Sequence, residues 1–456
     1  MQQARQSAPS KRPGVRRPAA ARSQAHTAAA PARGIPQGSP APTRAPNPAK
    51  PVKPVKQAKP KVKRRKKVKD PNRIKLLSFH SRVDVPMLLL VMVLLVFGIT
   101  MMFSAGHALS YRDNKGDSFY YVTRQLTAAG LGLVGMFFLT FFDYRFLRYE
   151  FRVLGGKRRI TATHLVVAAS MLLNLLTIPF GIAAEGGQKR WLPIPGFGQF
   201  QPSDMLKIAV IVYFAYYIHK HSDKMRKFYD GIWIPGLMLV LMILSMISQT
   251  HLSCMVIICL VFVAMLFVGG SNLKYLLPIC VLVALAAVFA VMVLDVGYFK
   301  ERILFMDPLS EPGDRSYQNY QSALAIGSGG LWGKGFGNSS QKYYYLPEAP
   351  NDFVYAVLVE EFGLVGGLVV ILLFLIFVFR GFYIARKSED KFGCLLATGI
   401  TFQIGLQAFL NLGVNLCCIP NTGISMPFFS YGGTALMFQL WEMGLLLSVS
   451  KRAKLS

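Results

Sequence analysis

Charged residues are scarce in this chain of 456 residues and make up only 16% of it. Because 53% of the residues are hydrophobic and the mean hydropathy is +0.38, the chain is too apolar for a soluble protein of this length. Its apolar runs are continuous and lack the alternation of membrane β-barrel strands. The composition therefore predicts a polytopic, all-α membrane protein.

Cysteine is also sparse, and the six cysteines lie in or next to apolar runs without the spacing of metal ligands. The adjacent Cys417 and Cys418 are poor candidates for a mutual disulfide. We interpret all six as packing residues and predict no metal site. No apolar stretch precedes about residue 85, so we expect no cleavable signal peptide.

About ten apolar runs, most of them about 16 to 26 residues long, are near the length that crosses about 30 Å of hydrocarbon. A short turn around Gln249 to His251 separates the fifth run from the sixth, and a large polar loop, 296–353, separates the seventh from the eighth. The runs cover residues 85–106, 122–142, 161–182, 204–218, 232–249, 251–269, 275–295, 354–379, 393–416 and 427–449.

Positive charge gathers in three loops between these runs, at 143–160, 219–230 and 380–392. With ten spans, these loops and both termini fall on one side, which the positive-inside rule makes cytoplasmic. The large loop is then extracellular. The segments expected to face outward are 183–203, 296–353 and 417–426.

Residues 1–82 hold about 22 Lys and Arg but a single acid, Asp70, and almost no aromatic residues. Such a segment cannot bury enough apolar surface to fold, so we expect a disordered cytoplasmic tail ahead of a ten-helix membrane domain, 83–452. The basic run Lys61–Lys69 would be attracted to anionic membrane lipids, although a topogenic tail without a specific partner is an equal alternative. Nothing in the tail folds into a nucleic-acid-reading module, so we predict no nucleic-acid partner.

The outward segment 183–203 and the span that follows it carry basic residues that suit an anionic ligand. Lys189 and Arg190, next to Trp191, suit a pyrophosphate or a lipid headgroup, although an interfacial anchor is an equal alternative. Lys207 lies one turn into the fourth span, where a cation must face a partner or a water-filled cavity. Ser203 or Asp204 is expected to cap that helix.

The eighth span carries an intramembrane acid pair, Glu360 and Glu361, which we expect to face away from lipid. A buried structural role, paired with Lys207 or with a backbone donor, is the alternative to a functional role for these acids. Irregular backbone at 420–433 breaks and restarts helices at the outer face, which indicates that this segment lines a cavity or is buried in protein.

The outer loop supplies acids that could act as a general base toward a hydroxyl nucleophile, although most surface acids have no such role. A glycine-rich stretch, 327–337, could form a backbone anion nest or a tightly turning re-entrant loop. The acids are Asp307, Glu311, Asp314, Glu348 and Asp352.

Four motifs in combination resemble the SEDS family (shape, elongation, division and sporulation), over nearly all of 83–452. Segments GNSSQKYYYLPE and NDFVYAV are similar to the FtsW/SpoVE branch rather than to RodA. The motifs are KRW and QPSD within 189–204, YQNYQSALAIGSGGLWGKGFGNSSQK at 317–342, LPEAPNDF at 346–353 and PNTGISMPFFSYGG at 420–433.

The resemblance implies a peptidoglycan glycosyltransferase of the bacterial cytoplasmic membrane. It would polymerise lipid II onto a nascent glycan lipid at the outer face during cell division, by inverting displacement. Implied partners are a class B penicillin-binding transpeptidase and divisome proteins, and no cofactor is certain, although a divalent cation such as Mg would suit the pyrophosphate. A flippase for a lipid-linked precursor and a noncatalytic scaffold are the alternatives.

The resemblance also assigns residues. In the family, the presumed catalytic aspartate begins a DP dipeptide six residues before the Tyr-Gln pair, which is Tyr317-Gln318 here. That place holds Glu311-Pro312 in this chain. Asp307-Pro308, further upstream, is the second choice for the catalytic acid, and Asp314 is the third. The family's QPDLG reads Gln249-Thr250-His251-Leu252-Ser253, so no role is carried over for its aspartate. The substrate-binding candidates are Lys189, Arg190, Trp191, Lys207, Gln318, Lys342, Asp352 and Ser430.

Overall fold

The structure is a computed structural model, and it describes residues 83–153, 158–183, 189–194, 198–249, 251–281, 317–421 and 423–454. The basic tail, most of the seventh apolar run and the acids Asp307, Glu311 and Asp314 lie outside the described residues. The tail and the catalytic acids therefore stay predictions.

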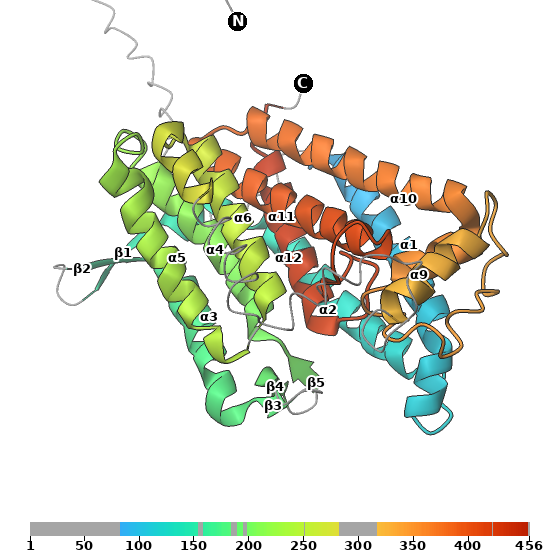
Figure 1. The fold of residues 1–456 in the computed structure, drawn as a ribbon. Coiled ribbons are helices and arrows are strands. Elements are labelled where there is room, and N and C mark those ends of the chain that lie inside the picture. The colour runs from blue at the N-terminus through green and yellow to red at the C-terminus, as the bar shows by residue number, and fades with distance from the viewer. Residues whose placement is uncertain are drawn as a thin grey trace, which may run out of the picture. The chain divides into compact units, whose positions relative to one another are not determined.

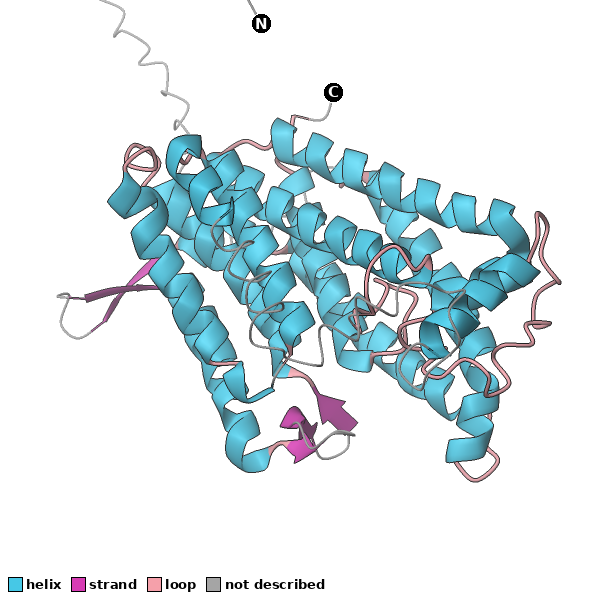
Figure 2. Ribbon diagram, in the orientation of Figure 1, coloured by secondary structure: helices cyan, strands magenta, loops and turns pink. Residues whose placement is uncertain are grey.

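Helices account for the other nine apolar runs, as Figures 1 and 2 show. A π-helical turn, η2 (Tyr229–Trp233), precedes α5, and a 3-10 turn, η3 (Ile247–Gln249), follows it before α6. The main helices are α1 (Val85–Asp113), α2 (Tyr120–Phe141), α3 (Ala162–Phe180), α4 (Pro202–Lys220), α5 (Ile234–Leu244), α6 (Leu252–Gly269), α9 (Tyr317–Ser328), α10 (Val354–Lys387), α11 (Lys391–Asn415) and α12 (Gly433–Ser450).

Five of the described helices, α1, α2, α3, α10 and α11, are long and apolar enough to cross a membrane. Helix α4 is less apolar because it packs against α3, α6, α11 and α12, and most of its side chains are buried among them. A helix enclosed by other helices need not be apolar on every face, since little of it meets lipid. The chain is thus an all-α polytopic membrane protein, and the count of ten spans stays a prediction.

Two small antiparallel sheets lie in the connections, which a purely helical prediction overlooks (Figure 2). Strands β1 (Glu150–Val153) and β2 (Arg158–Thr161) pair between α2 and α3. Strands β3 (Ile182–Ala183), β4 (Lys189–Ile194) and β5 (Gly198–Phe200) pair in the order β3-β4-β5 between α3 and α4. The second sheet carries the Lys-Arg-Trp motif, so pairing fixes the direction of those side chains.

Helices α2 and α12 make the most extensive contact between any two described elements. A Cβ added at Gly132 would lie 2.6 Å from Leu440 Cδ1, and one at Gly444 would lie 2.7 Å from the Met136 carbonyl oxygen. Small residues let helix backbones approach closely where no water drives them together. Glycine therefore sets the distance between these two helices.

One end of the bundle gathers two of the basic loops predicted to share a side, together with the C-terminal segment. Asp390, between α10 and α11, accepts hydrogen bonds from Tyr144 Oη at 2.7 Å and Arg148 Nη1 at 2.6 Å. Near the C-terminus, Arg452 Nη2 lies 2.7 Å from Asp143 Oδ2. The loop after α2, the loop after α10 and the C-terminal segment are thus at one end, as predicted.

At the other end, the segment 329–346 packs against a break in α10. Gly363 has φ +68°, and the amide groups of Lys334 and Gly335 donate to the Glu360 and Glu361 carbonyl oxygens at 3.0 and 2.9 Å. A methyl group at Gly333 would overlap the backbone of Glu361. The glycine-rich stretch thus serves a close backbone approach, in line with its structural interpretation.

Candidate active-site cavity

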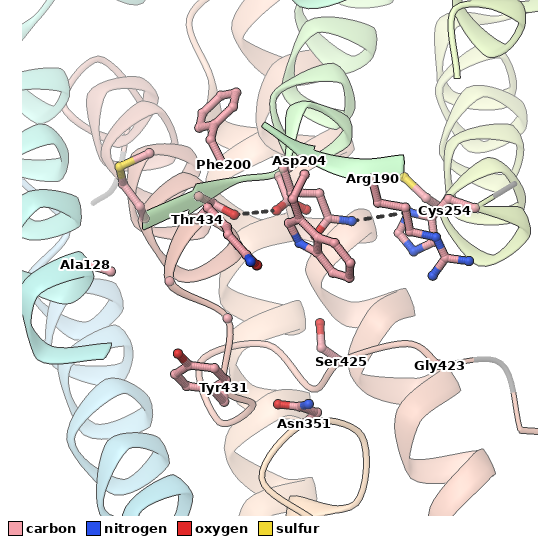
Figure 3. A pocket seen from close by; sticks show the side chains of 18 of the residues that line it. Ala128, Arg190, Phe200, Asp204, Cys254, Asn351, Gly423, Ser425, Tyr431 and Thr434 are labelled. Carbon is pink, nitrogen blue, oxygen red and sulfur yellow. Dashed lines mark hydrogen bonds between the residues drawn. The ribbon is translucent and has the colours of Figure 1, made fainter. Parts of the chain in front are cut away.

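A cavity of about 1360 Å³ opens at this second end, between segments that are far apart in the sequence. Its walls come from the start of α2, from β4 and β5, from the starts of α4 and α6, and from the loops before α10 and α12. Figure 3 shows Arg190 and Asp204 on one side, with Asn351, Ser425 and Tyr431 on the other. All three segments predicted to face outward contribute to this lining.

The side formed by β4, α4 and α6 is rich in cations. Lys207 is almost fully buried, and its Nζ lies 3.0 Å from Asp204 Oδ1, one helical turn away. Arg190 Nε donates to the Gln249 carbonyl oxygen at 3.0 Å, which directs the guanidinium along the wall. Trp191 lines the same side. This wall can therefore neutralise and orient an anionic group.

The partner of Lys207 differs from the expected one. It pairs with Asp204, whose other oxygen accepts from Thr434 Oγ1 at 3.3 Å, so the alternative of an ion pair with Glu360 or Glu361 is wrong. The capping prediction for Ser203 and Asp204 is also wrong. Gln201 is the N-cap residue without a side-chain cap, because the Asp204 carboxylate is engaged with Lys207 and Thr434.

The opposite side carries the acids Glu348 and Asp352. Burial, and then the negative charge of Glu348, raise the pKa of Asp352 to about 7. Its backbone is held in place by Asn411 Nδ2 and Asn415 Nδ2, which donate to the Asp352 carbonyl oxygen at 2.8 and 3.0 Å. A fixed carboxyl group that titrates near neutral pH is suited to proton transfer or to binding hydroxyl groups.

Four of the predicted binding residues, Arg190, Trp191, Lys207 and Asp352, come together in the cavity, and the other four do not line it. Lys189 is exposed, and its Nζ donates to the Ile178 carbonyl oxygen at 3.2 Å. The others make contacts that fix loops. Gln318 Oε1 accepts a hydrogen bond from Asn421 Nδ2 at 2.7 Å. Ser430 Oγ accepts one from the Met426 amide at 2.7 Å. Lys342 Nζ donates to the Glu361 carboxylate at 2.9 Å.

The intramembrane acids hold the segment 334–342 onto α10. Glu360 lies 2.6 Å from Lys334 Nζ and accepts from the Ser340 amide at 3.0 Å, while Glu361 is paired with Lys342. These contacts agree with a structural role, with partners other than Lys207. Among the described residues, no group of three or more His, Cys, Asp or Glu side chains is placed to hold a metal ion.

A family model described as "Cell cycle protein", that of FtsW, RodA and SpoVE, matches residues 85–455 of the chain. The chain belongs to this family. It is 36% identical over 372 residues to the probable peptidoglycan glycosyltransferase FtsW of Geobacter sp. (strain M18), covering 81% of this chain and 97% of that protein. It is 33% identical over 374 residues to stage V sporulation protein E of Bacillus subtilis (strain 168), covering 81% and 98%.

The fold is also that of a solved family structure. One solved structure is that of a peptidoglycan synthase complex, described as coordinating polymerization and crosslinking. A chain of that complex superposes on this one with a TM-score of 0.64 at 27% identity, and the match covers 82% of this chain and 99% of that one. The resemblance to the SEDS family is thus confirmed. As predicted, the family match leaves the basic tail out.

Against this family background, three lining residues stand out that motif reasoning did not select. Arg124 lies in the second apolar run, where an arginine is costly unless it faces a cavity or partner, and that position was a usable signal. His251 lines the cavity beside Arg190, although the resemblance carried no role over to its stretch, 249–253. Thr434 gave no signal, since its role depends on the long-range contact with Asp204.

Proposed function

We propose that the chain is a peptidoglycan glycosyltransferase that polymerises lipid II into glycan strands during cell division. The observation that carries the proposal is a single cavity with cations on one wall and acids on the other, in a member of a family whose relatives bear that activity in their names. A lipid-linked substrate accounts for a site at the end of a membrane bundle. We place the site at the outer face and both termini in the cytoplasm.

In the reaction, the 4-hydroxyl oxygen of an incoming lipid II forms a bond to the anomeric carbon of the nascent glycan lipid. The bond from that carbon to the pyrophosphate oxygen breaks, so the configuration is inverted and the pyrophosphate lipid leaves. The hydroxyl proton passes to a carboxylate, for which Glu311 is our first choice and Asp307 our second. Arg190 and Lys207 offset the charge that develops on the leaving pyrophosphate.

The walls position the two substrates. Trp191 offers an apolar face beside Arg190 for a sugar ring or isoprenoid segment, and Asp352 accepts hydrogen bonds from sugar hydroxyls on the opposite side. Holding both reactants in one cavity converts their encounter into a reaction within a complex, which is a large part of the rate enhancement.

The partner is a crosslinking enzyme, since the polymer must be joined to existing wall. The complex that contains the structural relative is described as coordinating polymerization and crosslinking, which supports a class B penicillin-binding transpeptidase as partner here. Divisome proteins and, for the basic tail, anionic lipids complete the proposed set. The alternative of a flippase has less support, since the charges of Glu360 and Glu361 are neutralised by Lys334 and Lys342.

Polymerisation by the purified protein tests the proposal. The chain and its transpeptidase are incubated with lipid II, and glycan strands are separated on a gel. We expect long strands from the natural chain, at least about 100-fold less product from Glu311→Gln or Asp307→Asn, and reduced product from Arg190→Gln. Lys189→Gln, which changes an exposed neighbour outside the cavity lining, is the control. Absence of polymer from the natural pair would refute the activity, and full activity of both acid variants would refute the choice of base.

A further inference from the structure

His251 lies between η3 and α6, outside both helices, and faces the cavity next to the cationic wall. Gln201 Nε2 and His251 Nδ1 are 3.5 Å apart, close to the limit of a hydrogen bond, so Gln201 restrains the ring weakly. The cavity therefore has, beside its cationic wall, a group that can gain a positive charge.

The groups that face His251 come from each neighbouring element. Arg190 on β4 and Lys207 on α4 are positive, Asp204 on α4 is negative, and Cys254 lies one turn along α6. Glu348 and Asp352 lie on the opposite wall, and Arg124 on α2. Burial, and then the positive charge of Arg190, lower the pKa of His251 to about 4, so the imidazole is neutral at pH 7.

An anion at this wall reverses that balance. Lys207 is already neutralised by Asp204, so a pyrophosphate group brings more negative charge than Arg190 offsets. The excess favours the imidazolium form of His251. We propose that His251 takes up a proton when a pyrophosphate group binds at the Arg190–Lys207 wall, and so adds a cation to the site only while the anion is present.

The inference rests on the proposed function in one respect, that the natural ligand is the pyrophosphate of a polyprenyl lipid. Free pyrophosphate offers the same charge, and a lipid pyrophosphate adds an apolar chain. The sign of the effect follows from linkage: if the bound state holds one proton more, affinity rises as pH falls, by up to tenfold for each pH unit. An aspartate at the same place would oppose the anion whenever it is ionised.

Calorimetry on the purified full-length chain in detergent tests the inference. Inorganic pyrophosphate and farnesyl pyrophosphate are titrated separately at pH 8 and pH 6, each in two buffers of different ionisation enthalpy, which measures the protons taken up. Both ligands titrate themselves, so the comparison is between the natural chain and His251→Asn. At pH 8 we expect the affinity of His251→Asn for each ligand to be within about threefold of that of the natural chain. On going from pH 8 to pH 6, we expect the gain in affinity to be about tenfold smaller for His251→Asn than for the natural chain.

Two further variants keep the result specific. His221→Asn, at the end of α4 away from Lys207, should bind pyrophosphate with the same pH dependence as the natural chain. Asp352→Asn removes the cavity carboxyl group whose pKa is about 7, and should leave the His251-dependent proton uptake in place. Tighter binding of the farnesyl ligand identifies a lipid carrier as the source of the anion, which supports the proposal. Equal binding of the two ligands also supports the proposal, and identifies free pyrophosphate as the source of the anion.

Equal pH dependence in the natural chain and a folded His251→Asn variant would overturn the inference, as would the absence of pyrophosphate binding at either pH. If His251→Asn fails to fold, His251→Gln takes its place with the same criteria. The glycan-strand assay is independent of these outcomes. Polymerisation without His251-dependent proton uptake would leave the proposed function intact and reject only this inference.

Discussion

Lys342 is the most completely enclosed cation among the described residues, and it joins three parts of the bundle. Its Nζ donates to Glu361 on α10 at 2.9 Å, to Ser104 Oγ on α1 at 3.2 Å and to the Gly337 carbonyl oxygen at 2.7 Å. Both side chains of the ion pair are fully buried. A buried charge is costly unless it is paired and hydrogen-bonded, so each partner depends on the other.

Replacing Lys342 by methionine is expected to destabilise the protein by about 3–5 kcal/mol, because Glu361 then keeps a buried charge without a counter-ion. The loss of stability is measured as a fall in the melting temperature of the protein in detergent, with unfolding detected by a thiol-reactive dye or by intrinsic fluorescence. Adding Glu361→Gln to the variant should recover part of the loss. Lys189→Met, an exposed change, should melt like the natural chain, and an unchanged melting temperature for Lys342→Met would contradict the prediction.

Asp352 makes stability depend on pH. Its pKa in the folded protein is about 7, above its ordinary value of 3.8, so ionisation costs stability. The cost grows as pH rises from about 4 to about 7 and is constant above that. Asp352→Asn removes it.

We therefore expect the melting temperature of Asp352→Asn to exceed that of the natural chain by a margin that widens between pH 5 and pH 7. Thermal denaturation at half-unit pH intervals measures the margin. Asp223→Asn, in the exposed loop after α4, provides the matched control. A margin for Asp352→Asn that narrows with rising pH would show that the carboxylate is stabilised in the folded protein.

Among elements, α10 combines a span with a break. The apolar run predicts a single helix, but the backbone turns at Gly363 so that the Leu364 amide donates to the Gly330 carbonyl oxygen at 2.9 Å. The outer segment thereby fills the place of the missing turn. Because Glu348 and Asp352 follow this segment directly, the break helps to place the acidic wall of the cavity.

Gly363→Ala is expected to lower the melting temperature and the yield of glycan strands together. A methyl group there would be strained by the positive φ and would overlap the Leu331 carbonyl oxygen. Gly130→Ala in α2 is the matched control, since the space around Gly130 is open and alanine favours helix by about 1 kcal/mol. If Gly363→Ala melted at the same temperature as the natural chain, the segment 329–335 would be able to shift without loss of stability, which would contradict the prediction.

The elements were largely predictable from local pattern, whereas their breaks and pairings were not. Continuous apolar runs identified α1, α10 and α11, because lipid contact acts on each span separately. The partner of Lys207 and the burial of Lys342 depend on residues more distant in space than any motif reports. Lys207 was correctly expected to need a partner or a cavity, and it has both.

At the scale of the whole molecule, the cavity joins segments from α2 to the start of α12, and its charges are divided between walls. Sequence reasoning placed the three outward segments on one side through charge in the loops, and the structure brings them to one end of the bundle. It could not tell which side chains converge, since that depends on helix rotation and on packing between distant segments. Arg124 and Thr434 entered the site in this way.

Membrane orientation is testable with single cysteines in a variant whose other cysteines are replaced. Cys418, exposed in the connection before α12, should react with a membrane-impermeant maleimide in intact spheroplasts. A cysteine introduced by Glu389→Cys, in the exposed loop between α10 and α11, should react only after permeabilisation. The reverse pattern would place the cavity in the cytoplasm and contradict the proposed function.

The glycine-lined contact between α2 and α12 also has a consequence for biogenesis. Gly132 and Gly135 of α2 are shaped for Leu440 and Trp441, which leave the ribosome roughly 300 residues later. At about 5–20 residues per second, α2 waits at least about 15 seconds in the translocon or lipid before its partner arrives. A nascent chain that stops before Gly433 would leave the glycine-lined face of α2 uncovered in the bilayer. Insertion of α12 is therefore the step at which membrane quality control can distinguish a finished molecule from an unfinished one.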